Sequence, residues 1–245
     1  MRVTLYCTVV LLLAISGCAT SGSAEAELGL RDGYEAVEVR RVGMLRIMAE
    51  SRWGMTEQEL QQMLGVYEDQ SGEGLGKLGF EVVPHPDILQ SLEGTPYHDR
   101  LGEALDIDRS LGELFEDASP AGNEERLETV MAIGTHAKVQ AVFLARVVYH
   151  TEATCNGTAE SEFTPHVILP DGTPRDATVP CAVSHFEAKL IDTRSGKTIW
   201  YNRALREVRA GSAQAQVPDA DANARAAVDL VLHQGPTSLQ MLVQR

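Results

Sequence analysis

The run from Val139 to Tyr149 constrains the fold more than any other part of the sequence. It reads Val-Gln-Ala-Val-Phe-Leu-Ala-Arg-Val-Val-Tyr, with apolar residues at both odd and even positions. A strand with such apolar continuity has both faces covered, as in the middle of a sheet between layers of helices. The sequence therefore predicts a sheet with this segment near its centre and helices packed against it.

Shorter strand and helix patterns flank this central run. Strands are expected around residues 42–48, 80–83, 185–192 and 198–205, and helices around 57–78, 87–92, 123–136 and 222–233, with one or two more amphipathic helices within 93–122. Residues 193–197 join the last two strands as a hairpin loop, in which Gly196 can adopt a positive φ. This order predicts an α/β (α+β) fold, with a mixed sheet, covering helices and a C-terminal antiparallel hairpin followed by a helix.

The start of the first helix carries the most specific local signal. Thr56 and Glu59 form a capping-box pattern, and Met55 and Leu60 are spaced as a hydrophobic staple around it. Glycines at 72–76 weaken the end of this helix, by about 1 kcal/mol each relative to Ala. They allow either close packing on a sheet or a break. Further along, Asn123 is expected to cap the helix that leads to the central strand.

The amino terminus has the pattern of an export signal. Arg2 gives a positive start, and an apolar run extends from Leu5 to Ile15. A signal-peptide core has about 7–15 residues, whereas a membrane-spanning helix needs about 20. Small residues then lead directly into Cys18. Residues 1–17 are therefore expected to be a cleaved signal peptide. For Cys18, the alternative to lipid attachment is that it is an incidental cysteine in a plain secreted protein.

The segment Ile15-Ser16-Gly17-Cys18 resembles the lipobox of bacterial lipoproteins. This resemblance implies cleavage before Cys18, acylation of its sulfur by a diacylglycerol and, usually, a palmitate-like third chain on the new amino group. Two or more acyl chains give stable membrane attachment. The next residue is Ala19 rather than Asp, which in that family favours the outer membrane. The resemblance thus implies a lipid-anchored protein on the periplasmic face of the outer membrane.

The rest of the chain divides into a tether and one domain. Residues 18–36 are mostly small and polar and are expected to form a lipidated, flexible tether with a reach of at most ~60 Å. Residues 37–245 form a single α/β domain, with an irregular excursion at 152–180 that contains prolines and an Asp-Gly turn. Because loops on rigid scaffolds often bind partners, this excursion is the expected contact surface.

Cys155 and Cys181 bracket the excursion. In an oxidising compartment they are expected to form a disulfide, worth roughly 3–4 kcal/mol by loop-closure arguments. A metal site that includes His166 and His185 is one alternative, and free thiols are the other. No paired-cysteine motif with zinc-ligand spacing is present.

Composition and motifs argue against several functions. The 245-residue chain has a formal net charge of −14 and no basic cluster larger than Arg40-Arg41, which disfavours binding to nucleic acid. It contains neither Gly-x-Ser-x-Gly nor His-Glu-x-x-His. No catalytic residue, cofactor-binding residue or metal ligand is predicted, and we expect a non-enzymatic protein.

Three segments together suggest a family, and the first runs from the strand end at residues 45–48 through a helix into residues 78–83. Residues 132–144 join a helix end, Thr-His-Ala-Lys-Val, to the central strand, and residues 188–200 contain Asp-Thr-Arg-Ser-Gly-Lys-Thr-Ile-Trp. These segments resemble the curli-secretion (CsgG-like) lipoproteins and the similar amino-terminal domain of the Tol-system propeller protein. There a Gly-Ala-Asp helix end leads into the strand, and an Asp-x-x-Ser/Thr-Gly-x-x-apolar-Trp segment forms the hairpin.

This resemblance implies a non-enzymatic role in the cell envelope, as a protein-binding or assembly component. A curli-type pore would need membrane hairpins with about ten alternating residues per strand. Neither 93–122 nor 152–180 has that pattern, so no pore is expected. The alternative function is a lipoprotein that binds a small ligand or an envelope polysaccharide.

The lipobox reading makes a direct prediction. Cells that express the wild-type chain should incorporate radioactive palmitate into it, whereas Cys18→Ser should abolish the labelling, because the acylated sulfur is missing. Labelling that persists in Cys18→Ser would rule out the anchor at this position.

Overall fold

The computed structural model describes residues 29–30, 38–50, 54–102, 120–156, 167–168, 174–175, 178–210, 216, 219–233, 239 and 242. The expected signal peptide, Cys18, most of the tether and much of the excursion lie outside these residues. Among the residues that the structure places, no helix is both long and apolar enough to cross a membrane.

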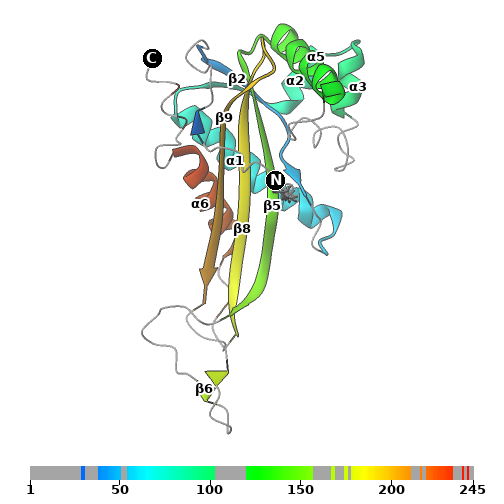
Figure 1. Cartoon of the computed structure of the whole chain (residues 1–245). Helices are drawn as coiled ribbons and strands as arrows, with labels where there is room; N and C mark the ends of the chain where they lie inside the picture. The colour runs from blue at the N-terminus through cyan, green and yellow to red at the C-terminus, as the bar shows by residue number, and fades with distance from the viewer. Residues whose placement is uncertain are drawn as a thin grey trace, which may run out of the picture.

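A seven-stranded mixed sheet organises the domain, as Figure 1 shows. Its strands are β1 (Gly29–Leu30), β2 (Arg41–Met44), β3 (Met48–Ala49), β4 (Glu81–Val83), β5 (Ala141–Asn156), β8 (Thr178–Asp192) and β9 (Thr198–Arg209). Their order is β1-β9-β8-β5-β2-β4, with β3 also on β5. A separate two-stranded sheet consists of β6 (Val167–Ile168) and β7 (Pro174–Arg175). β5 pairs parallel with β2 and antiparallel with β8, which confirms the predicted central position.

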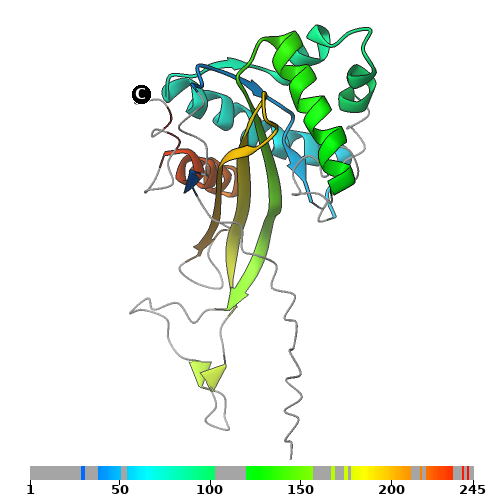
Figure 2. The ribbon, with the colours of Figure 1, turned by 45° about the horizontal axis from the view of Figure 1, so that its top comes forward.

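Helices cover both faces of this sheet (Figures 1 and 2). On one face lie α1 (Glu57–Lys77) and α6 (Ala220–His233), and over one end of the other lie α2 (His85–Ser91), α3 (Pro96–Gly102) and α5 (Pro120–Ala137). Two buried clusters result, one under α1 and α6 and one under α2, α3 and α5. The mixed sheet, its covering helices and the β8–β9 hairpin followed by α6 confirm the predicted α/β fold.

The first helix begins as predicted. The Thr56 hydroxyl accepts a hydrogen bond from the Glu59 backbone N–H, while the Glu59 carboxylate accepts one from the Thr56 backbone N–H. Glycine late in this helix allows close packing rather than a break, but the packing is against helix α6 and not against the sheet as expected. A Cβ added at Gly74 would lie 2.6 Å from Leu232 Cδ1 of α6, so this glycine lets the two helices approach each other.

Some predicted boundaries differ from the structure. α5 begins at Pro120, and Asn123 lies within it instead of capping it. Proline suits the first position of a helix because its missing N–H has no helical acceptor there and its φ is already helical. Residues 152–156 and 178–180 of the expected excursion belong to β5 and β8, which pair as far as Asn156 and Thr178.

One irregularity interrupts the long β5–β8 ladder. Val147 is opposite Phe186, yet Tyr149 is opposite His185, so Val148 is an extra residue on β5. Such a bulge reverses the side of the sheet on which the following odd and even residues of the strand point. Side chains on β5 beyond the bulge therefore have the orientation opposite to that expected from regular alternation.

The β8–β9 hairpin loop packs closely against the end of α5. The Thr193 hydroxyl donates to the carbonyls of Val139 and Gln140, and Gly134 lies directly against the Thr193 side chain. Gly196 has a φ of 65°, as the hairpin pattern predicted. This contact sets the position of α5 on the sheet.

Gly134→Ala should therefore destabilise the domain by about 2–3 kcal/mol, because the new methyl group overlaps Thr193. Urea unfolding measures the change. Gly65→Ala is the matched control: nothing lies within 4 Å of the added methyl group, and the better helix propensity should stabilise by about 0.5–1 kcal/mol. Equal stability of the two variants would contradict the tight packing.

Candidate functional site

Three long strands extend beyond α2, α3 and α5 and leave part of one sheet face without these helices (Figures 1 and 2). Neighbouring side chains on a strand point to opposite faces. Ser184 of β8 and Asn202 of β9 point towards α6, because they contact Asn223 Nδ2 and the Val231 carbonyl. His150 of β5 points towards α1. The intervening residues therefore share the opposite side.

We call this side the open face and define it by two rows of residues. The first row runs across the sheet as Arg146, Glu187 and Arg203, and the second as Tyr149, His185 and Leu205. Each row takes one residue from β5, one from β8 and one from β9. The bulge at Val148 brings Tyr149 onto this side, next to His185, instead of towards α1.

A buried carboxylate, that of Glu187, joins Arg146 of the first row to His185 of the second. Arg146 Nε and Nη2 each lie 2.9 Å from Glu187 Oε2, and His185 Nε2 lies 3.3 Å from Glu187 Oε1. Arg146 Nη1 also lies 3.4 Å from Glu50 Oε1. Burial raises the pKa of Glu187, but the His185 hydrogen bond and the Arg146 charge outweigh it, so the net shift is downward. The Glu187 carboxylate is therefore ionised and fixed at neutral pH.

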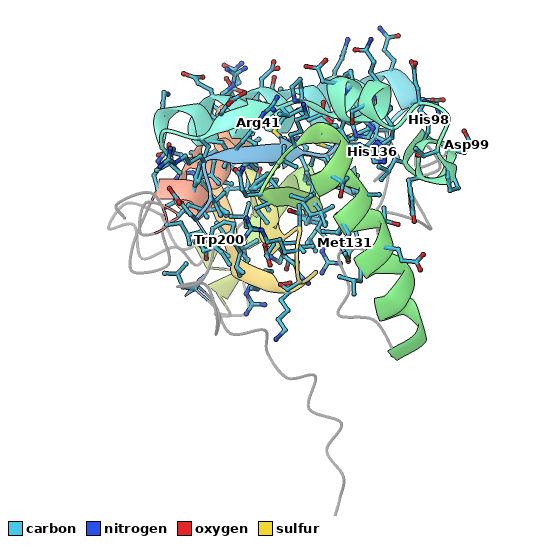
Figure 3. The ribbon with its side chains drawn as sticks, turned by 90° about the horizontal axis from the view of Figure 1, so that it is seen from above. Arg41, His98, Asp99, Met131, His136 and Trp200 are labelled. Carbon is cyan, nitrogen blue, oxygen red and sulfur yellow. The ribbon has the colours of Figure 1, made fainter. Side chains whose placement is uncertain are left out.

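The second row exposes apolar surface. Leu205 is 68% exposed and Tyr149 is 40% exposed. Among the residues that the structure describes, the only other exposed large hydrophobic side chain is that of Met131, which lies on α5 (Figure 3) and not on the three strands. Tyr149 and Leu205 stand on either side of β8, about 10 Å apart by strand spacing. Tyrosine and arginine are enriched at the centre of protein–protein interfaces.

Opposite the open face, β5 is anchored to α1. The Tyr67 hydroxyl lies 3.1 Å from His150 Nδ1, and the Tyr67 ring stacks on Phe186 with 5.3 Å between ring centroids. Burial raises the pKa of Tyr67 to about 12, so the hydroxyl stays protonated. These contacts hold the backbone of β5 at His150, next to Tyr149, whose side chain points to the opposite side of the sheet.

The two cysteines predicted to pair lie on adjacent strands at the far end of the open face. Cys155 of β5 is opposite Val179, and Cys181 of β8 is opposite Ala153. Cys155 and the residue opposite Cys181, Ala153, are thus two residues apart along β5. The disulfide itself stays a prediction, as does lipidation of Cys18, which lies outside the described residues.

The alternative metal site gains no support from the placed side chains. His185 faces Glu187, and no group of three or more His, Cys, Asp or Glu side chains suited to a metal occurs among the residues described. His166, the other candidate ligand, lies beyond them. The Glu187 carboxylate is held by Arg146 and His185.

No protein-family model matches the sequence, and no curated protein matches it. Similar solved structures include lipoprotein GNA1162 from Neisseria meningitidis, with 11% identity, a TM-score of 0.39 and coverage of 71% of this chain and 85% of that one. The PelC dodecamer from Paraburkholderia phytofirmans has 12% identity, a TM-score of 0.37 and coverage of 80% of this chain and 86% of that one. The LpoB C-terminal domain from Salmonella enterica has 10% identity, a TM-score of 0.31 and coverage of 69% of this chain and 83% of that one.

These similarities include a bacterial lipoprotein and leave the family unassigned. None of the three names the curli-secretion or Tol proteins, so that resemblance stays a prediction. The site therefore rests on the geometry of this chain.

Sequence reasoning did not locate the open face. It selected the excursion 152–180 because loops often bind, whereas the exposed apolar residues lie on regular strands. The sequence feature that could have indicated the open face is Leu205, an apolar residue that alternates with the charged residues Arg203 and Glu207 on the second strand of the hairpin. Tyr149 gave no such signal, because it ends an apolar run and its direction depends on the bulge.

The ion-pair network makes a pH-dependent prediction. Glu187→Gln should lower stability by about 2–3 kcal/mol at pH 7, since Arg146 and His185 lose a buried carboxylate. Because the pKa of Glu187 is lowered from 4.5, its contribution is complete above about pH 4.5 and disappears as the pH falls through the folded-state pKa. The wild-type and variant urea curves should therefore converge on acidification.

Glu93→Gln serves as the control, because Glu93 is exposed after α2 and its replacement should change stability by less than about 0.5 kcal/mol. A gap between wild type and Glu187→Gln that stays constant from pH 7 to pH 3.5 would contradict the role given to the ionised carboxylate.

Proposed function

We propose that this chain is a non-enzymatic, outer-membrane-anchored periplasmic lipoprotein that binds another envelope protein through the open face. The observation that carries the proposal is the row Tyr149, His185 and Leu205, which exposes an aromatic and an aliphatic side chain from rigid strands beside fixed charges. The lipobox-like segment supports the location.

The ion pairs of Glu187 would prepare the surface for binding. Arg146 and His185 are held by Glu187, so a partner that covers them need not immobilise long side chains on arrival. Tyr149 and Leu205 would supply the apolar contact that loses water. The Arg203 side chain, exposed at the rim, favours a partner with carboxylates around an apolar centre.

Lipid on Cys18 would add to the weak affinity of a small patch. An anchored domain meets membrane-associated partners at a high effective concentration, which strengthens binding without new contacts. A patch with two apolar side chains at its centre can therefore suffice when both proteins are confined to one membrane surface.

Site-specific photocrosslinking in intact cells tests the proposal. A photoreactive residue in place of Leu205 should form a specific protein adduct, and Tyr149→Ala in the same chain should reduce its yield by roughly 5- to 30-fold, as for loss of an interface anchor worth about 1–2 kcal/mol. Adducts are identified by mass spectrometry.

Met131 provides the matched control, since it is hydrophobic and 44% exposed but lies on α5. A photoreactive residue there should not form the same adduct. Equal adducts from both positions would overturn the proposal. The absence of a protein adduct at Leu205, together with a glycan bound to the purified chain, would also overturn it and would favour the polysaccharide-binding alternative.

A further inference from the structure

The strand β9 lies at one edge of the long part of the sheet. Among the residues that the structure describes, β1 is its only outer neighbour, and β1 pairs with Trp200 and Tyr201 alone. From there β9 continues to Arg209, on the outer side of the three long strands in Figure 1. The backbone N–H and C=O groups at such an edge are a template on which another strand can pair.

We infer that a second copy of this chain pairs with this edge, so that the β9 strands of the two copies form an antiparallel ladder. The two-fold axis passes between Leu205 of one copy and Leu205 of the other, and the ladder spans residues 202–208 of each. This range stops before Tyr201, which pairs with β1. The inference goes beyond the envelope partner proposed above and does not rest on it.

The residues of β9 on the open face are complementary to themselves. Arg203, Leu205 and Glu207 follow one another on that side by strand alternation. In an antiparallel pair centred on Leu205, Arg203 of each copy lies opposite Glu207 of the other, and the two leucines lie opposite each other. Opposite charges and apolar side chains that face each other directly stabilise neighbouring strands. The two-fold symmetry repeats the charge pair on both sides of the leucines.

Other registers lose this match. A shift of two residues in one direction puts Leu205 opposite Glu207, and a shift of two in the other direction puts it opposite Arg203. The second shift also needs Tyr201, which β1 already occupies. A shift by one residue places the open face of one copy beside the helix-covered side of the other. The side chains therefore favour the register centred on Leu205.

The exposure of these side chains supports contact at this edge. Leu205 is 68% exposed, more than any other large hydrophobic side chain among the described residues. Arg203 and Glu207 are exposed as well, and their pairs across the axis would add to the contacts that they make within one chain. Pairing would thus cover part of the most exposed apolar side chain and place charges of opposite sign beside it.

Pairing would also join the open faces of the two copies. A two-fold axis perpendicular to the sheet keeps both open faces on the same side. The second row of one copy, Tyr149, His185 and Leu205, would continue through Leu205 of the other copy to its own His185 and Tyr149. The two apolar patches would therefore become one surface with the leucines at its centre.

Charge reversal tests the inference in the purified full chain, with no other protein present. The wild-type chain should sediment as a dimer that dissociates on dilution, since a short ladder buries less surface than a permanent interface. Arg203→Glu should raise the dimer dissociation constant by roughly tenfold, because it creates two pairs of like charges. The double variant Arg203→Glu with Glu207→Arg restores opposite charges and should return the constant to within about threefold of wild type.

Cysteine cross-linking measures the register. Leu205→Cys should form a disulfide-linked dimer on oxidation, because directly opposite residues are within bonding range. Arg203→Cys is the matched control: it is exposed on the same face but lies about 13 Å along the strands from its counterpart. It should cross-link to itself at least about tenfold less, and should link efficiently to Glu207→Cys chains mixed with it.

Three results would overturn the inference: a chain that is monomeric at every concentration, a double variant no better than Arg203→Glu, or equal cross-linking of Leu205→Cys and Arg203→Cys. Slow amide exchange of residues 203–207 in a monomer would also overturn it, since another part of the same chain would then cover the edge. None of these results decides the proposed envelope partner, which is tested by adducts with a different protein in cells.

Discussion

The antiparallel ladder between β5 and β8 is the constraint on which the rest of the domain depends. It runs from Ala141 and Asp192 at one end to Asn156 and Thr178 at the other. The part near Ala141 and Asp192 lies between two helical layers, which pack against it through separate buried clusters. The part towards Asn156 and Thr178 extends beyond α2, α3 and α5, so one pair of strands provides both the core and the exposed surface.

The sequence was most informative where a local rule applies without help from distant residues. The capping box at Thr56, the apolar run of β5 and the hairpin glycine at 196 each depend on short-range chemistry, and all three occur as predicted. The start of α5 was misplaced because both Pro120 and Asn123 favour a helix start, and the pattern does not rank them.

The open face was beyond sequence reasoning for a different reason. The side of the sheet that Tyr149 faces depends on an extra residue in β5, Val148. Because Val147 and Val148 belong to an unbroken apolar run, the sequence pattern does not reveal the extra residue. The grouping of Arg146, Glu187 and Arg203 depends on the register of three strands. Neither property is local, so neither follows from spacing along one strand.

The bulge at Val148 also affects how related sequences should be compared. In a relative of equal length with a regular ladder, the residue aligned with Val148 would pair opposite that of His185, and the residue aligned with Tyr149 would face α1 rather than solvent. Its counterpart of His150, now buried beside Tyr67, would become the outward-facing residue. Residue identity at aligned positions is therefore a poor guide to shared surface here, and the presence of the bulge must be established first.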